Sequence, residues 1–182
     1  MSVTRRTVVV TLVAMVAALL GLSAPAHAAA PATSGTVASS TVTSTNFYRL
    51  YNPRNHDIFH TTSQDEVASA VAGGYAYQGV GALVSPAAGS GLVPFYRLYH
   101  PRNGDHFHTT NFDEVASAVA GGYRYEGIAA YVYPANSRSG IPFYRLYHPG
   151  SGDHFHTTNY DEVISAASGG FRYEGIAARV LG

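Results

Sequence analysis

Phe47-Tyr48-Arg49-Leu50-Tyr51 is the stretch that decides the fold, because the same five residues return at Phe95 and again at Phe143, each time 48 residues further on. The following sequence returns in the same register, with an Asp, then a His-Thr-Thr triplet, an Asp-Glu-Val triplet and a Gly-Gly pair. A fixed period of this length is typical of an architecture built from repeated units. Whatever one unit binds, the protein is expected to bind up to three times.

The first half of each unit is predicted to be a β-hairpin. In the second copy, residues 95–99 are rich in aromatic side chains that favour strands. Asn103-Gly104 then marks a tight turn, because both residues tolerate the left-handed backbone conformation. Residues 106–110 are expected to form the returning strand.

The second half of each unit is predicted to be a short helix followed by extended chain. The helix is expected over residues 113–120, with Asn111 as its N-cap, Glu114 returning the capping bond and a Gly-Gly pair at its end. Residues 123–133 are expected to be extended, as one strand or as two strands bent at Gly127. Each unit is therefore predicted to be ββαβ.

The predicted fold class is β-rich α+β, in one domain over residues 47–182 with units at 47–94, 95–142 and 143–182. One such unit cannot bury its apolar face alone, so the three units are expected to share a core. The absence of a distinct capping unit favours closure around a pseudo-threefold axis in a β-trefoil-like body. The alternatives are a small propeller-like ring and an open three-unit solenoid.

The N-terminus has the features of an export signal. Two Arg residues precede an apolar run over residues 8–22, and a small-residue cleavage pattern ends at Ala28. We expect residues 1–28 to be a signal peptide, by the ordinary secretory route or the twin-arginine route. Residues 29–46 are expected to be a flexible Ala-, Ser- and Thr-rich segment. The mature protein is then expected to be extracellular.

The composition excludes several classes of partner. All eleven basic residues are Arg, and without the two in the signal peptide nine Arg stand against eleven acidic residues, a formal net charge of −2. A basic nucleic-acid surface needs clustered positive charge, which this balance does not provide. The sequence contains no Cys and, after processing, no apolar run long enough to span a bilayer. We therefore expect no nucleic-acid partner, no membrane span and no disulfide.

The first candidate site is the Asp-His-Phe-His motif. His106 and His108 are two residues apart on a predicted strand, so both side chains leave the same face. Imidazoles beside a carboxylate are ligand types that zinc and other first-row metals take. The first copy has Ile58 in the place of His106, so only His60, His108 and His156 recur in all three copies. One interpretation is a divalent-metal site of these three His on the axis. The simpler interpretation is hydrogen bonding across the sheet.

The second candidate site is a set of Tyr, Arg, His and carboxylate side chains that recurs in each unit. Aromatic faces provide apolar contact at low entropy cost, while Arg and carboxylates beside them suit sugar hydroxyls. The alternative interpretation is that the Tyr residues pair across strands and that the Arg and Glu residues form ion pairs. The predicted ligand-binding residues are Arg49, Tyr51, Asp57, Arg97, Tyr99, Asp105, His106, Arg124, Glu126, Arg145, Tyr147, Asp153, His154, Arg172 and Glu174.

Signals for catalysis are weak. The sequence has no Gly-x-Ser-x-Gly elbow, no Cys nucleophile and no phosphate-binding Gly loop. The repeated Asp-Glu pairs lie in the first turn of each predicted helix, where capping and the helix dipole explain them. We predict no catalytic residue and no cofactor. A metal-dependent hydrolase that uses the Asp-His-x-His strands is the alternative.

The repeat resembles a family of secreted domains of unknown function that look like accessory modules of bacterial and fungal extracellular hydrolases. The resemblance covers residues 47 to about 180, and in the second copy its motifs are residues 95–101, residues 104–110, Glu114 and residues 122–129. His108 and His156 stand where that family commonly has Tyr. The resemblance implies an exported binding module more than an enzyme, and it brings no ligand or site residue.

These observations together predict a secreted, non-catalytic module that binds extracellular or cell-wall polysaccharide. Binding would be weak at each unit and would gain from multivalency. A cell-surface domain that binds another protein is a further alternative.

Overall fold

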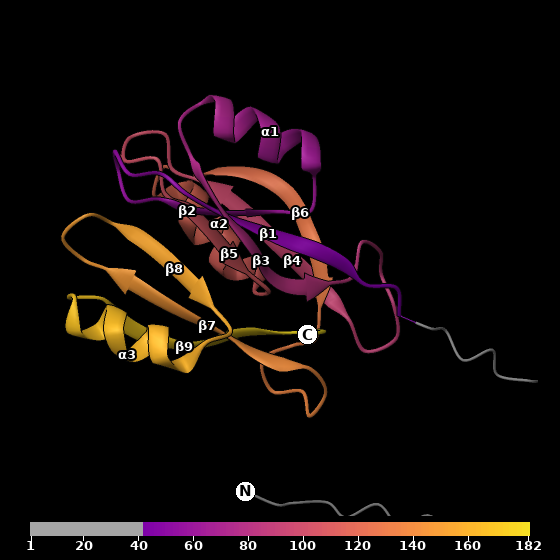
Figure 1. The fold of residues 1–182 in the computed structure, drawn as a ribbon. Helices are drawn as coiled ribbons and strands as arrows, with labels where there is room; N and C mark the ends of the chain where they lie inside the picture. The colour runs from indigo at the N-terminus through magenta and orange to yellow at the C-terminus, as the bar shows by residue number, and fades with distance from the viewer. Residues whose placement is uncertain (1–41) are drawn as a thin grey trace, which may run out of the picture. The chain divides into compact units, whose positions relative to one another are not determined.

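Three units of one design make up residues 42–182, the part of the chain that the computed structural model describes (Figure 1). Each unit has the predicted order ββαβ. The first contains β1 (Thr45–Tyr51), β2 (Ile58–Thr61), α1 (Gln64–Ala72) and β3 (Ala76–Val84). The second contains β4 (Val93–Tyr99), β5 (His106–Thr109), α2 (Phe112–Ala120) and β6 (Arg124–Val132). The third contains β7 (Ile141–His148), β8 (Asp153–Thr157), α3 (Tyr160–Ser168) and β9 (Arg172–Val180).

Most of the predictions for the N-terminus concern residues outside this part of the chain. The signal peptide predicted over residues 1–28 lies outside the described residues, as does most of the flexible segment predicted over residues 29–46. The first strand begins at Thr45, slightly before the expected start of the domain at Phe47. Among residues 42–182, no helix combines the length and the apolar character that a membrane crossing requires.

Each unit forms its own three-stranded antiparallel sheet with its first strand in the centre. The strand orders are β2-β1-β3, β5-β4-β6 and β8-β7-β9. The last strand of the second unit is a single strand, and the bend predicted at Gly127 is a register shift within it. Gly127 has a φ of 108°, a conformation that glycine adopts without a steric cost.

The glutamate in the first turn of each helix makes a different contact from the one expected. Asn111 caps α2 by accepting a hydrogen bond from the Asp113 N–H at 2.9 Å. The Asn111 N–H was predicted to donate to the Glu114 side chain, but it donates to Thr109 Oγ1 at 3.0 Å. Glu114 instead accepts two hydrogen bonds from Arg145 in the next unit, at 2.9 and 3.1 Å. The capping box prediction was therefore wrong for this residue, which links two units.

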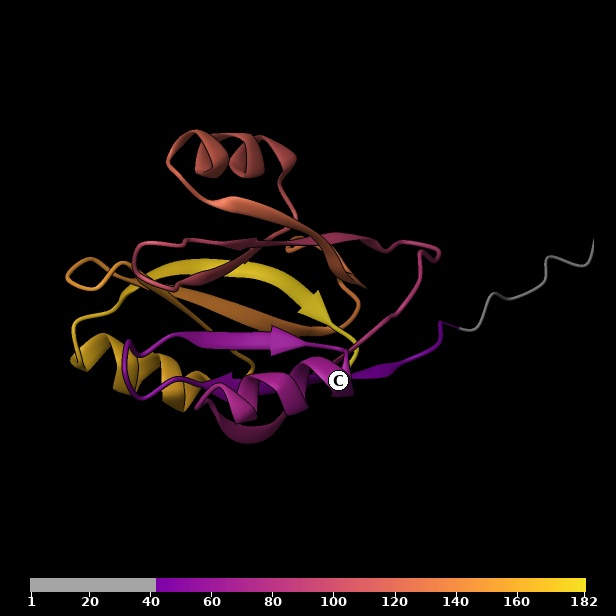
Figure 2. The ribbon, with the colours of Figure 1, turned by 90° about the horizontal axis from the view of Figure 1, so that it is seen from above.

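The three units share one hydrophobic core. Phe47, Phe95 and Phe143 are fully buried, and their ring centroids lie 6.2–6.4 Å from one another. One Ala and one Val from the last strand of each unit complete the cluster: Ala82, Val84, Ala130, Val132, Ala178 and Val180. Figure 2 shows the three helices on the outside of the three sheets. A separated unit would expose its share of this core to water.

The units are also linked in a circle by backbone hydrogen bonds. Ser85 in the first unit pairs with Tyr131 in the second, and Tyr133 in the second pairs with Arg179 in the third. The Leu83 N–H donates to the carbonyl of Gly182, which links the third unit back to the first. These links are isolated bridges, and the described residues are arranged in three separate three-stranded sheets. The predicted α+β class and the three-unit design are confirmed.

Candidate ligand-binding pocket

A buried Asp in each unit faces the next unit around the circle, and these contacts define three junctions. At the first junction, between units one and two, His106 Nδ1 lies 2.7 Å from Asp57 Oδ2 and the His106 N–H donates to Asp57 Oδ1 at 2.8 Å. The Tyr75 hydroxyl donates to Asp57 Oδ2 at 2.8 Å. The His106 ring packs between Phe59 and Tyr99, with centroid distances of 4.6 and 4.9 Å. Three donors and two aromatic rings therefore fill this junction.

The second junction, between units two and three, repeats the arrangement. His154 Nδ1 lies 2.7 Å from Asp105 Oδ2, and the His154 N–H donates to Asp105 Oδ1 at 2.7 Å. The Tyr123 hydroxyl donates to Asp105 Oδ2 at 2.7 Å. Burial of a carboxylate is costly unless its oxygens are hydrogen-bonded, and both of these junctions meet that requirement.

The third junction, between units three and one, lacks both side-chain donors. Ile58 stands in the place of His106 and His154, and Phe171 stands in the place of Tyr75 and Tyr123. Asp153 is only 2% exposed, and neither of its oxygens has a hydrogen-bond partner among residues 42–182. Burial raises the pKa of Asp153 above its ordinary value, and the neighbouring Ser151 and His56 offset only part of that rise. The same fold thus satisfies this carboxylate at two junctions and leaves it unpaired at the third.

The turn beside Asp153 also departs from the repeat. Asn103 Nδ2 donates to the carbonyls of Ser151 and Gly152 across the second junction, both at 3.2 Å. Ser151 stands at the equivalent position of the third unit, and its shorter side chain carries no amide to reach the first unit. The neighbouring position is glycine in the second and third units, with positive φ, but it is His56 in the first.

His56 is the one non-glycine residue of the described chain that has a positive φ, at 69°. A side chain in this conformation costs free energy, which the surrounding structure has to offset. His56 Nδ1 is hydrogen-bonded to the Tyr51 hydroxyl at 2.7 Å. This bond holds the exposed imidazole on the first-unit side of the third junction.

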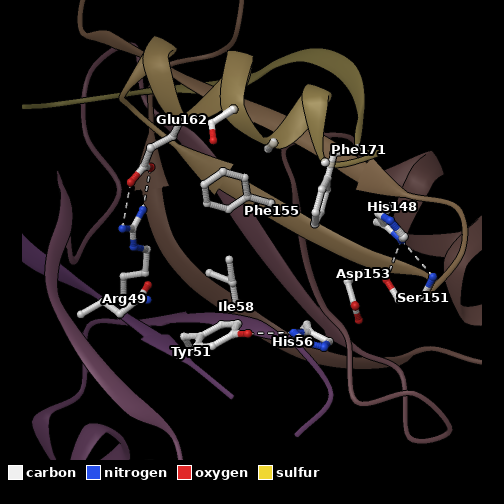
Figure 3. A pocket seen from close by; sticks show the side chains of 14 residues that line it. Arg49, Tyr51, His56, Ile58, His148, Ser151, Asp153, Phe155, Glu162 and Phe171 are labelled. Carbon is white, nitrogen blue, oxygen red and sulfur yellow. Dashed lines mark hydrogen bonds and ion pairs between the residues drawn. The ribbon is translucent and has the colours of Figure 1, made fainter. Parts of the chain in front are cut away.

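A pocket of about 580 Å³ opens at the third junction (Figure 3). Ile58, Phe155 and Phe171 give it an apolar wall. In the close-up, Asp153 lies between His56 and Ser151 on the opposite side from the Arg49–Glu162 pair. The other lining residues are Arg49, Tyr51, His56, Gln78, His148, Ser151, Asp153, Glu162, Ser165, Ala166 and Gly169. Its volume is in the range of small-molecule sites, roughly 300–1,000 Å³.

An ion pair between units one and three borders the pocket. Arg49 donates to both carboxylate oxygens of Glu162, at 2.9 and 3.1 Å. These hydrogen bonds lower the pKa of Glu162, so it is ionised at neutral pH. At the other junctions the equivalent Arg also pairs with a Glu of its own unit, at 2.7 Å. Gln78 replaces that Glu in the first unit, which leaves the Nε side of Arg49 without the second carboxylate.

The three recurring His residues meet in the shared core. His60, His108 and His156 are fully buried, with ring centroids 5.4–6.3 Å apart, and each packs against the core Phe of its own unit. Burial lowers the pKa of all three, that of His60 to about 3, so they are neutral at neutral pH. Within the described residues, no group of three or more His, Cys, Asp or Glu is arranged to hold a metal ion. None of their ring nitrogens has a hydrogen-bond partner among these residues, so the predicted hydrogen bonding across the sheet is wrong for this triad, which packs in the core.

The outer face of each unit carries exposed aromatic side chains. Tyr77, Tyr125 and Tyr173 are 44–50% exposed, and each lies about 6 Å from a second Tyr of its own sheet. In the second and third units a helix residue, Phe112 or Tyr160, extends the cluster. These Tyr residues form cross-strand pairs, as one interpretation of the sequence predicted, and they also remain open to solvent.

Comparison with protein families matches residues 46–181 to the family described as Domain of unknown function (DUF5648). The chain belongs to this family. The predicted resemblance to a domain of unknown function is thereby confirmed, whereas its secretion stays a prediction. A search of the curated proteins and a search of the solved structures each found no match. The function of this DUF5648 domain has therefore to be argued from its own geometry.

The predicted ligand-binding residues fall into three groups in the DUF5648 domain. Arg49, Tyr51 and Asp153 line the third-junction pocket. Arg124 and Arg172 are exposed on β6 and β9. The others form contacts within or between units: Asp57, Arg97, Tyr99, Asp105, His106, Glu126, Arg145, Tyr147, His154 and Glu174.

Sequence reasoning missed His56, Ile58 and Phe171 as parts of one site. The signal that reveals them is difference rather than repetition. Each is a position at which one copy departs from the other two, and all three departures line the same pocket.

Proposed function

We propose that this DUF5648 domain is a secreted carbohydrate-binding module whose principal site is the third-junction pocket. The observation that carries the proposal is the unpartnered, buried carboxylate of Asp153 in a pocket with aromatic walls. A junction selected for stability alone would keep the His and Tyr donors found at the other two junctions. Their replacement by apolar residues opens a space and leaves an acceptor for a ligand.

The lining of the pocket suits a sugar ring. A saccharide presents apolar C–H faces and polar hydroxyl edges. The apolar faces of the sugar can pack against the aromatic rings of Phe155 and Phe171. Its hydroxyls can bond to acceptors on Asp153 and Glu162 and to donors on Arg49.

The exposed Tyr clusters support binding to a polymer rather than to a single sugar. Three clusters on one rigid domain add weak contacts to the pocket, and linked contacts strengthen overall binding without a new site. This part of the proposal assumes that the units form a closed ring about a pseudo-threefold axis. The nearly equal distances between the three core Phe rings and the circular unit-to-unit links support that arrangement.

The proposal is tested by retention on insoluble peptidoglycan and chitin, together with a glycan array. Two variants separate the sites: Ile58→His combined with Phe171→Tyr fills the pocket, and Tyr125→Ala removes one exposed aromatic. We expect the pocket-filling variant to lose most binding and Tyr125→Ala to lose a smaller part, with both variants folded by circular dichroism. If the unmodified protein is not retained on any polymer at low salt, the proposal is rejected.

A further inference from the structure

We propose that the saccharide docks in the third-junction pocket through a protonated amine, which pairs with the carboxylate of Asp153; this inference rests on the proposed function above. The ligand class is therefore a saccharide with free amino groups, as in deacetylated chitin-type chains.

The two filled junctions show what this carboxylate accepts. Asp57 receives two side-chain donors and one backbone N–H, and one of the side-chain donors is an imidazole nitrogen. An ammonium group presents three N–H donors from a single compact atom. It can therefore donate to the Asp153 oxygens, which no residue among 42–182 reaches.

Charge favours an amine over a neutral hydroxyl at this position. Arg49 and Glu162 compensate each other, whereas Asp153 has no hydrogen-bond partner among residues 42–182. The titratable side chains His56 and His148 also line the pocket. Burial favours the neutral form of an unpaired Asp153, and an ammonium beside it favours the ionised form and donates to it. A neutral hydroxyl donates one hydrogen bond and brings no charge. An N-acetylated amine carries no charge and is bulkier, so acetylation removes the advantage.

Two features place the amine beside Asp153 rather than elsewhere in the pocket. Ile58, Phe155 and Phe171 form a wall with no polar side-chain atom to receive a cation. Glu162 is already bonded through both oxygens to Arg49. Among the lining carboxylates, Asp153 is the one whose oxygens are unoccupied.

The strained conformation of His56 is an independent sign that this side of the pocket is a site. A glycine stands at that position in the other two units, so the fold does not need a side chain there. His56 nevertheless occupies the left-handed conformation and is fixed by Tyr51 at the rim of the pocket. Strained residues of this kind persist where the surrounding structure holds them, and they cluster at functional sites.

The test is isothermal titration of the purified chain with three probes of equal length: a glucosamine oligomer, the matching N-acetylglucosamine oligomer and a glucose oligomer. The same titrations are made on Asp153→Asn and on Asp161→Asn, a matched variant that removes an exposed carboxylate of the first turn of α3. Thermal unfolding checks that each variant is folded. We expect the glucosamine oligomer to bind roughly tenfold or more tightly than the other two. We expect Asp153→Asn to abolish that preference and Asp161→Asn to keep it.

The outcomes separate the two levels of the proposal. Equal affinity for the glucosamine and N-acetylglucosamine oligomers overturns the amine inference and leaves carbohydrate binding standing. An amine preference that survives in Asp153→Asn also overturns it, because the attraction would then be a general one for a polycation. Binding of none of the three probes rejects the proposed function itself.

Discussion

Restoring the repeat at the third junction should stabilise the protein. The change is Ile58→His together with Phe171→Tyr, which returns to this junction the two side chains present at the others. At the first junction those side chains place a donor 2.7 Å and another 2.8 Å from the carboxylate oxygens. The same geometry at Asp153 would give partners to a carboxylate that now has none within residues 42–182.

The expected size of the effect follows from those contacts. A hydrogen bond to a charged group contributes about 1.5–3 kcal/mol, and an unsatisfied buried polar group costs about 1–3 kcal/mol. The two introduced side chains lose conformational freedom, which offsets part of the gain. We therefore expect the free energy of unfolding to rise by about 3 kcal/mol. For a domain of roughly 140 residues this corresponds to an increase in Tm of about 9 °C.

The measurement is urea unfolding followed by circular dichroism, with calorimetry for Tm. Asp153→Asn is the informative companion, because it removes the unpaired carboxylate without filling the pocket. It should also raise stability, by about 1 kcal/mol. The reasoning is refuted if both variants are less stable than the parent while retaining the same fold, since Asp153 would then already be satisfied.

Four other outcomes follow from the structure. Asp105→Asn, in a filled junction, should lower the free energy of unfolding by about 3 kcal/mol in urea titration. This is the opposite direction from Asp153→Asn. Equal effects of the two substitutions would contradict the contrast between the junctions. His56→Gly should raise stability by about 1 kcal/mol in the same assay and weaken saccharide binding, because it relieves the left-handed side chain and removes a rim residue; unchanged binding would exclude His56 from the site. The free energy of unfolding should fall by about 4–5 kcal/mol between pH 6.5 and 3 through His60 alone. The reason is that the unfolded imidazole binds a proton near pH 6.5 and the folded one only near pH 3. A flat pH profile of urea midpoints would show that the buried ring is protonated without cost. Phe95→Ala should lower the free energy of unfolding by about 3–5 kcal/mol, because the Phe95 ring contacts the other two units. For the same reason the variant should unfold in a single transition. A second transition would mean that the units unfold independently.

The sequence predicted the design of one unit well because that design depends on local signals. Aromatic runs, the Asn103-Gly104 turn and the Asn111 cap each specify structure within a few residues, and all three elements are present. The helix begins at Phe112, one residue before the prediction, which is within the usual uncertainty of helix ends. Residue patterns could not show that Glu114 would turn away from its own cap, because its partner Arg145 lies in the next unit.

The candidate site was predicted only in part, for a similar reason. Repetition drew attention to residues such as Arg97 and His106, which the structure uses to join units. The replacement of His106 by Ile58 was visible in the sequence, but its consequence was not. That consequence depends on which Asp faces which strand across a junction.

By itself, the sequence determined three ββαβ units, their short capped helices and their need for a common core, because propensity, turns and apolar spacing act along the chain. The tertiary structure decided which copies of a repeated residue have hydrogen-bond partners and which copy has none. Ile58 and Asp153 belong to the first and the third unit, and only the return of the last unit to the first places them at one junction. A pocket formed by long-range closure has no local signature, except that several of the residues lining it, such as His56, Ile58 and Phe171, stand at positions where the copies differ.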